Sequence, residues 1–196
     1  MKLARMEAYL AALPGGVDAH PECLHKGSVT RQVLRAFPTD KLPPLPAPVQ
    51  TLVREPPIAS AWVSEVHATA LYLAICDAHF PNDESYVTFS ADFNRKLLRS
   101  PLYRVLMLVA TPLRLMHHAG TRWSALHRGS TLRVEPVGEY TARGTVRYPT
   151  ELFPLLLLRC FATAFQAAVE GSGGRNVRVE MLARDARQAE YDVHWE

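Results

Sequence analysis

The chain has 196 residues, of which 48% are hydrophobic and 21% are charged. This balance excludes a disordered or low-complexity protein, and the length fits one globular domain with at most a small appendage. The 22 basic and 19 acidic residues give a formal net charge of only +3. None of these figures identifies a function, so the order of the elements has to supply the fold class.

The sequence contains no segment with the properties of a membrane anchor. The longest apolar runs, Val105–Leu113 and Leu152–Leu158, are shorter than the roughly 20 residues that a spanning helix needs. Arg5 and Glu7 interrupt the region where the apolar core of a signal peptide would lie. The three cysteines are odd in number and widely spaced, which is typical of free thiols in a reducing compartment. We therefore expect a cytoplasmic protein without a membrane span.

The N-terminal part is expected to be helical. Lys2–Leu13 has the pattern of a short amphipathic helix, and Ser28 is placed to cap a second one. From residue 38 to residue 57 the chain carries seven of its fifteen prolines, which predicts a loop with at most a short helix at Val49–Arg54. We assign residues 1–24 to an N-terminal helical extension and residues 25–196 to a single α+β domain that contains this proline-rich loop.

Helical patterns dominate from residue 60 to about residue 127. Two helices are expected before residue 100, the first with Ser60 as its N-cap. The next segment, Leu102–Ala110, is apolar nearly all round, which indicates a buried helix. Leu113–His118 forms another helix, and Gly120 is expected to end it.

The periodicity changes after residue 130. Thr131–Val137 and Tyr140–Tyr148 alternate apolar and charged residues across a tight turn. A long apolar helix follows over Glu151–Glu170, and residues 177–181 and 189–195 alternate again. These elements predict an α+β fold with a helical N-terminal half and a four-stranded antiparallel sheet whose apolar face is covered by helices.

No common catalytic motif is present. Gly171–Gly174 follows a helix, whereas a phosphate-binding loop precedes one, and neither a nucleophile elbow nor a zinc-protease helix occurs. Among the eight histidines, His117, His118 and His127 form the best candidate cluster. They leave a His-centred metal or haem-type sensor or enzyme open as an alternative. Our own expectation is a protein with no cofactor, no metal site and no enzymatic activity.

The near-neutral charge results from cancellation along the chain. Residues 1–89 carry seven basic and nine acidic residues, residues 90–147 carry ten and three, and residues 148–196 carry five and seven. The middle segment therefore has a net charge of +7 between two segments of −2. Its basic residues are spread over several elements, which favours a solvated surface or a self-contact. Anion or nucleic-acid binding through residues 90–147 stays open as a second alternative, with nucleic acid the less favoured partner.

Two segments, Leu102–Ala110 and Leu152–Phe165, are more hydrophobic than one buried stripe requires. Besides an ordinary core, two explanations are open: a homodimer interface, or an internal cavity that takes a small hydrophobic ligand. The candidate site is the cleft between helices 101–118 and 151–169 and the sheet. Its candidate lining residues, selected for size and for position on apolar faces, are Leu106, Val109, Leu113, Met116, Trp123, Phe161 and Phe165.

Several short segments occur in a characteristic order: His25-Lys26-Gly27-Ser28, Trp123, Gly129, Leu132–Val134, Asn176–Glu180, and Tyr191 with Trp195. In these features the chain resembles a family of uncharacterised paralogous proteins of similar length from myxobacteria. More distantly, it is similar to the ligand-binding fold shared by vinyl-reductase-type domains, haem nitric-oxide sensors and TRAPP vesicle-tethering subunits. The resemblance implies an α+β domain that dimerises through helices and binds small apolar molecules or protein partners.

The departures from these relatives limit what can be transferred. Haem sensors of this fold carry a Tyr-x-Ser-x-Arg motif that binds the haem propionates, and this sequence lacks it. Vinyl-reductase-type domains commonly place cysteines in the final hairpin, whereas Met181–Trp195 contains none. The leading hypothesis is therefore a non-enzymatic sensory or adaptor module for signalling. We expect a homodimer that binds a small hydrophobic ligand or a protein partner.

Overall fold

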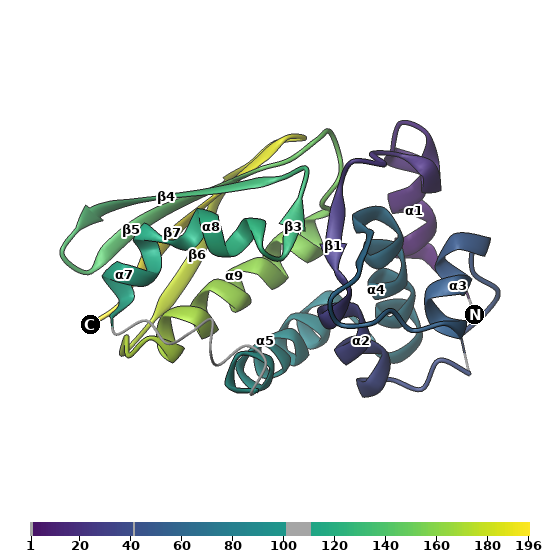
Figure 1. Ribbon diagram of the computed structural model, residues 1–196, viewed down its shortest axis with the longest axis horizontal. Coiled ribbons are helices and arrows are strands. Elements are labelled where there is room, and N and C mark those ends of the chain that lie inside the picture. The colour runs from purple at the N-terminus through teal and green to yellow at the C-terminus, as the bar shows by residue number, and fades with distance from the viewer. Residues whose placement is uncertain (1, 41, 101–110) are drawn as a thin grey trace.

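The structure analysed is a computed structural model that describes residues 2–40, 42–100 and 111–196. Helices of the N-terminal half gather at one end of the molecule, and a large sheet with its covering helices forms the other end (Figure 1). This arrangement confirms the predicted α+β class. The expected helix at Leu102–Ala110, which includes Leu106 and Val109, lies outside the described residues.

The N-terminal half is built around one buried helix, α4 (Glu65–His79). Eleven of its fifteen residues are buried, so it forms the centre of the main core. Side chains of Leu3, Met6 and Tyr9 belong to the same core, which makes the N-terminal helix part of the packed structure. The elements around α4 are α1 (Ala4–Ala12), η1 (Gly16–Asp18), α2 (Gly27–Ala36) and α3 (Ala47–Arg54).

The start of α4 differs from the prediction. Its N-cap is Ser64, whose side-chain oxygen accepts a hydrogen bond from the backbone N–H of His67 at 3.3 Å. Ser60 lies before a short strand, β2 (Trp62–Ser64), that the sequence pattern does not predict. Three residues are too few to show the alternation that marks a strand.

A three-stranded antiparallel sheet joins the two halves of the molecule. Its central strand is β1 (Leu24–Lys26), which pairs with β2 on one side and with β3 (His127–Arg128) on the other. Gly129 turns the chain away from β3 at a φ of +78°, and a Cβ at this position would lie 2.5 Å from the Cys23 sulfur. Only glycine fits this close approach.

The C-terminal half contains the predicted four-stranded antiparallel sheet, with the strand order β4-β5-β7-β6. Its first helix, α5, begins after Asn82, whose side chain accepts a hydrogen bond from the Ser85 N–H. The elements are α5 (Asp83–Arg99), α7 (Pro112–His117), α8 (Ala119–Ser124), β4 (Thr131–Gly138), β5 (Thr141–Arg147), α9 (Leu155–Gly171), β6 (Arg178–Arg184) and β7 (Gln188–His194).

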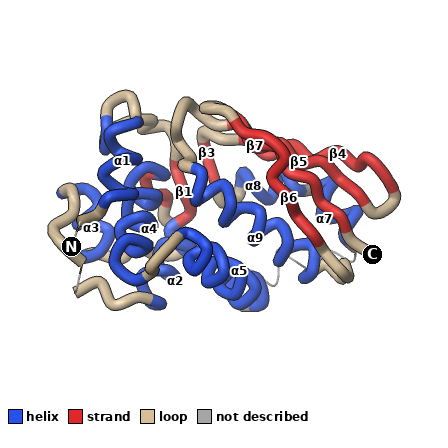
Figure 2. The backbone as a smooth tube through the Cα atoms, turned by 180° about the vertical axis from the view of Figure 1, so that it is seen from behind, coloured by secondary structure: helices blue, strands red, loops and turns tan. Residues whose placement is uncertain are grey.

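In the described part of the chain, helices cover only the apolar face of this sheet. Ala142, Val146 and Tyr191 are fully buried on that face, whereas Arg143 and Asp192 pair on the opposite face. Figure 2 shows α9 between α5 and the strands, and α7 and α8 lie beside β4. Gly120 sits inside α8 rather than ending α7. It brings α8 close to β4, since a Cβ there would lie 2.9 Å from the Leu132 carbonyl oxygen.

No helix in the described part of the chain is both long and apolar enough to cross a bilayer.

Candidate functional site

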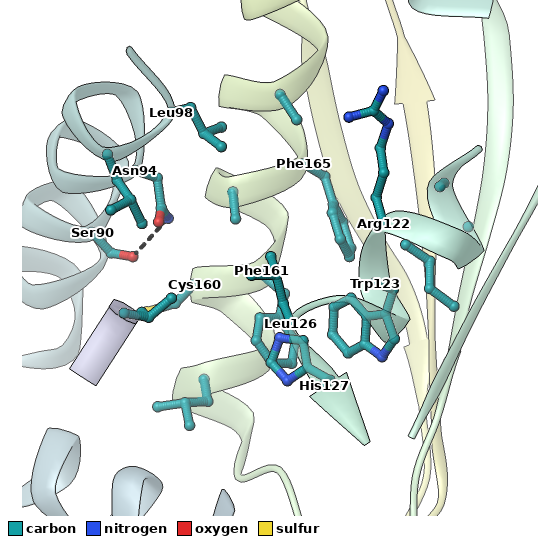
Figure 3. Close-up of a pocket in the computed structure, with 18 of the residues that line it drawn as sticks. Ser90, Asn94, Leu98, Arg122, Trp123, Leu126, His127, Cys160, Phe161 and Phe165 are labelled. Atoms are coloured by element: carbon teal, nitrogen blue, oxygen red, sulfur yellow. Dashed lines mark hydrogen bonds between the residues drawn. The ribbon is translucent and has the colours of Figure 1, made fainter. Parts of the chain in front are cut away.

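A cavity of about 270 Å³ lies between α5, α8, α9 and the apolar face of the four-stranded sheet. Ser90, Asn94 and Leu98 face it from α5 in Figure 3. Cys160, Phe161 and Phe165 face it from α9, and Arg122, Trp123, Leu126 and His127 lie on the opposite wall. Its volume is slightly below the range of roughly 300–1,000 Å³ that is typical of small-molecule sites.

Four of the seven predicted lining residues, Met116, Trp123, Phe161 and Phe165, face this cavity. Leu113 is not among the residues that line it, and its side chain is 43% exposed. Helical residues follow one another at about 100°, so α7 turns Leu115 and Met116 inward and leaves Leu113 outside. Leu106 and Val109, as stated above, are not among the described residues.

Part of the cavity wall consists of aromatic side chains that contact one another. The Phe161 ring meets the Trp123 ring edge-on at a centroid distance of 5.2 Å, and Phe165 meets Tyr191 in the same way at 5.1 Å. The Trp123 indole N–H donates to the Ser130 hydroxyl at 3.0 Å. These contacts fix the large rings in place, so the neighbouring space is not closed by a simple rotation of one side chain.

The polar groups on the α5 side of the cavity are already paired. Asn94 donates to the hydroxyl oxygens of Thr163 at 3.0 Å and of Ser90 at 3.3 Å. Burial raises the pKa of the Cys160 thiol to about 11, so this side chain is a neutral thiol at neutral pH. The Arg122 side chain differs, because its Nε is buried and has no hydrogen-bond partner.

A cluster of three buried ionisable residues, His25, Glu65 and His127, lines one part of the cavity. His25 is on β1 and faces His127 of β3 directly across the strand pair. Glu65 is the first residue of α4. The Nδ1 atom of His127 lies 2.8 Å from one Glu65 carboxylate oxygen, and the Nδ1 atom of His25 lies 3.6 Å from the other. We call these three residues the buried triad.

Burial sets the charge states within the buried triad. It lowers the pKa of His25 to about 4, against the opposing effect of the Glu65 carboxylate, so His25 is neutral at neutral pH. Burial alone would raise the pKa of Glu65, but the neighbouring His127 and His25 more than offset it and the pKa is lowered. Glu65 is therefore a carboxylate. Because His25 is neutral, its contact with Glu65 is not an ion pair.

The predicted cluster of His117, His118 and His127 does not form. His117 and His118 are exposed, whereas His127 is buried and contacts His25 and Glu65 instead. No spacing pattern in the sequence points to these partners, because the three residues of the buried triad come from three separate elements. Only the position of His25 within a characteristic N-terminal segment marked it.

Several basic residues of the segment 90–147 form ion pairs with carboxylates. Arg95 pairs with Glu170, Arg133 pairs with Glu135, and Arg143 pairs with Asp192. Glu170 and Asp192 lie outside residues 90–147, so these two carboxylates offset part of the +7 charge of that segment, which weakens the alternative of nucleic-acid binding.

The chain is similar to solved structures of H-NOX domains. An oxygen-binding H-NOX domain related to soluble guanylate cyclases, solved as its oxygen complex, matches with a TM-score of 0.60 at 7% identity, over 87% of this chain and 92% of that one. A Cs H-NOX mutant gives a TM-score of 0.58 at 10% identity, over 87% and 96%. A mutant H-NOX structure from T. Tengcongensis gives 0.58 at 8% identity, over 87% and 95%. The chain therefore has an H-NOX-like fold.

Residues 56–196 match the family described as "Protein of unknown function (DUF2378)". Because this match covers well over half of the chain, the protein belongs to the DUF2378 family. None of the curated proteins matches the chain. The similarity to vinyl-reductase-type domains and TRAPP subunits, and the myxobacterial relationship, stay predictions.

The described residues do not fit a haem, the group that the likeness to H-NOX domains raises. The Nε2 atom of His25 is hydrogen-bonded to the Tyr72 hydroxyl and its Nδ1 atom lies 3.6 Å from the Glu65 carboxylate, while the Nδ1 atom of His127 contacts the same carboxylate at 2.8 Å. Among the described lining residues, Arg122 is the only lysine or arginine available for two propionates. A cavity of about 270 Å³ is also small for a macrocycle of this size. The described lining of the cavity therefore does not suit a haem.

Proposed function

We propose that the protein is a sensory or adaptor module that binds a small hydrophobic ligand in the cavity between α5, α8, α9 and the sheet. The observation that carries this proposal is the cavity itself. Protein interiors are close-packed, and voids much larger than a water molecule are few. An apolar space of about 270 Å³ inside a chain of 196 residues therefore favours a binding role over a purely structural one.

The lining indicates the chemical character of the ligand. Aromatic and aliphatic side chains, among them Phe161, Phe165 and Met116, supply most of the wall and favour an apolar body. Arg122 adds one cation whose Nε is buried without a partner. A ligand with an apolar body and one small polar or anionic end would remove water from the wall and give this atom an acceptor.

The polar groups of the α5 side favour binding rather than catalysis. A catalytic hydroxyl or thiol needs a neighbouring base or a lowered pKa. The Ser90 hydroxyl instead contacts Thr163 and Asn94, and the raised pKa of Cys160 keeps its thiol protonated. These contacts support a non-enzymatic role for this wall of the cavity.

Three further parts of the proposal concern assembly and location. A homodimer and a protein partner rest on the strong hydrophobicity of Leu102–Ala110 and on the resemblance noted from the sequence. A cytoplasmic location is supported by the cysteines, since Cys23, Cys76 and Cys160 are all free. Native mass spectrometry of freshly purified protein tests assembly and co-purified ligand together. We expect a dimer that carries a small-molecule adduct.

A binding assay with a cavity-filling variant tests the site. Octanoate is titrated into the purified protein by calorimetry, and Ala164→Leu adds bulk to the α9 wall of the cavity. We expect binding to the native protein and at least a tenfold weaker affinity in the variant. The matched control is Ala11→Leu at an exposed position of α1, which should bind as the native protein does. Equal affinity in all three proteins would place the ligand elsewhere and refute the proposal.

A further inference from the structure

We propose that the buried triad of His25, Glu65 and His127 binds one divalent transition-metal ion, with an open coordination position that faces the cavity. Each side chain offers one ligand atom, and these atoms lie within 4.8 Å of one another. All three residues are buried, and all three line the cavity. This inference is independent of whether the cavity binds a hydrophobic ligand.

The distances suit ligands of a common ion. Ion-to-ligand distances of 2.0–2.2 Å in a tetrahedral site separate neighbouring ligand atoms by about 3.4 Å. The 3.6 Å between His25 Nδ1 and Glu65 is too long for a hydrogen bond but close to this spacing. His127 Nδ1 lies 2.8 Å from the other carboxylate oxygen, Oε2, and this contact would have to lengthen by about half an ångström. The three ligand atoms, which lie within 4.8 Å of one another, would have to draw together around the ion.

An ion would also resolve an unusual feature of His25. Its Nδ1 atom is buried and has no hydrogen-bond partner. Buried polar atoms without partners are rare, and each one needs a physical explanation. A hydrogen bond between His127 and Glu65 explains the short contact of those two residues, but it leaves Nδ1 of His25 without a partner. A cation bound at this nitrogen satisfies all three residues at once.

The backbone holds the three ligands in position before any ion arrives. His25 and His127 are directly opposite one another on adjacent strands, so their side chains project from the same face of the small sheet. The backbone N–H of Glu65 donates to the Cys23 carbonyl oxygen at 2.9 Å, which ties the start of α4 to the segment before β1. Rigid elements of this kind position metal ligands more precisely than loops do.

A second layer of contacts orients the two imidazole rings. The Nε2 atom of His25 lies 2.9 Å from the Tyr72 hydroxyl, which in turn lies 3.0 Å from the Thr30 hydroxyl. Metal-bound histidines typically donate their other N–H to such a partner, which fixes the tautomer. The His127 ring is stacked on Trp123 with an interplanar angle of 17°.

The ligand set determines the class of ion. Two imidazoles and one carboxylate suit zinc and non-haem iron, whereas calcium and magnesium prefer all-oxygen sites. Three protein ligands leave at least one coordination position open, and the triad borders the cavity. A water molecule, or the polar end of a molecule in the cavity, would occupy that position.

Cobalt(II) provides a direct test, because its visible absorption reports coordination number. The full chain is freed of metal with a chelator and titrated with Co²⁺, followed by competition with Zn²⁺. We expect one equivalent of Co²⁺ per chain, a visible band of four- or five-coordinate cobalt, and displacement by Zn²⁺. Glu65→Gln, which keeps the size of the side chain, should weaken binding at least a hundredfold.

Two more variants separate a ligand from a structural residue. Tyr72→Phe removes only the orienting hydroxyl and should weaken Co²⁺ binding by about tenfold. His79→Gln is the matched control, since the Nε2 atom of His79 is also buried without a partner but lies at the other end of α4. Circular dichroism verifies that each variant is folded. Absence of stoichiometric Co²⁺ binding, or equal affinity in Glu65→Gln and native protein, would overturn the proposal.

Discussion

The two sheets of this protein bury different kinds of side chain. The four-stranded sheet buries an apolar face, on which Tyr191 and Val146 are fully inaccessible, and it shapes one wall of the cavity. The three-stranded sheet is much smaller, but it holds His25 and His127 beside the Glu65 carboxylate. The first sheet therefore provides space and stability, and the second provides polar chemistry at the border of that space.

This difference shows how one cavity can combine two kinds of recognition. Apolar contacts are non-directional and tolerate ligands of varied shape, whereas a cluster of donor atoms requires a precise geometry. The large sheet and its helices form the apolar wall of the cavity, so the contacts that stabilise the fold also shape the cavity. The buried triad depends instead on two strands of only two and three residues. Substitutions in the two sheets should consequently have separable effects.

The largest effect on stability is expected at Tyr191. This side chain is fully buried, and its hydroxyl donates to the Leu158 carbonyl oxygen at 3.0 Å. Tyr191→Ala should lower the free energy of unfolding by about 4 kcal/mol, because it leaves a cavity under α9. Tyr191→Phe should cost only about 1 kcal/mol. Urea denaturation measures both.

The control for this prediction is Leu182→Ala, since Leu182 lies on the same sheet but is about half exposed. It should change the free energy of unfolding by less than about 0.5 kcal/mol. If Tyr191→Ala proved as mild as the control, the large sheet would not be the main source of stability, and the contrast with the small sheet would fail.

An effect of intermediate size, on ligand affinity, is expected when Arg122 is replaced. Arg122→Gln should weaken octanoate binding by about tenfold and leave octanol binding nearly unchanged, because a charge-assisted hydrogen bond to the carboxylate is lost. Calorimetry with the two probes gives the ratio. Arg114→Gln, at an exposed position of α7, should leave the ratio unaltered. An equal loss for both probes would indicate that Arg122 contributes by packing alone.

The smallest effect on stability is expected at the ion pair between Arg95 of α5 and Glu170 of α9. Arg95 donates to Glu170 at 2.9 Å, and this hydrogen bond lowers the pKa of Glu170 below its usual 4.5. The carboxylate therefore adds stability at neutral pH, and this contribution disappears as the pH falls below 4.5 through the lowered pKa. Because the pair is partly exposed, we expect about 0.5 kcal/mol.

Comparison with Glu170→Gln isolates this contribution. The native protein should exceed the variant in free energy of unfolding at pH 7, and the two should converge at low pH. A difference that persisted below the pKa of Glu170 would show that the side chain acts through packing or through its contact with Gln166 instead.

The long strands and α9 could be predicted from the sequence because their signals come from residues that are close together in the chain. Alternation over seven or eight residues identifies β4 to β7, and the apolar run of α9 with its glycine-rich end identifies a helix. Ser64 was missed as the N-cap of α4, because the short strand before it carries no periodic signal. The same limit hid β1 and β3, and with them the three-stranded sheet.

The candidate site could be predicted only in its apolar part. Trp123, Phe161 and Phe165 were found because large side chains on apolar faces point into the core whatever their exact partners are. Leu113 was placed inward by the same argument, but it faces outward on a helix of only six residues. The buried triad could not be found, since the pairing of His25 with His127 depends on how the two halves pack against each other.

The pairing of β1 with β3 has a consequence for how the molecule assembles. It joins residues that lie more than one hundred positions apart in the chain, so it closes by far the longest loop of the small sheet. Contacts of such high sequence separation are entropically costly and form slowly. The triad is therefore complete only once both halves have docked. An ion or molecule that binds there would bind only after the two halves have docked. It would stabilise the docked state and slow the separation of the two halves.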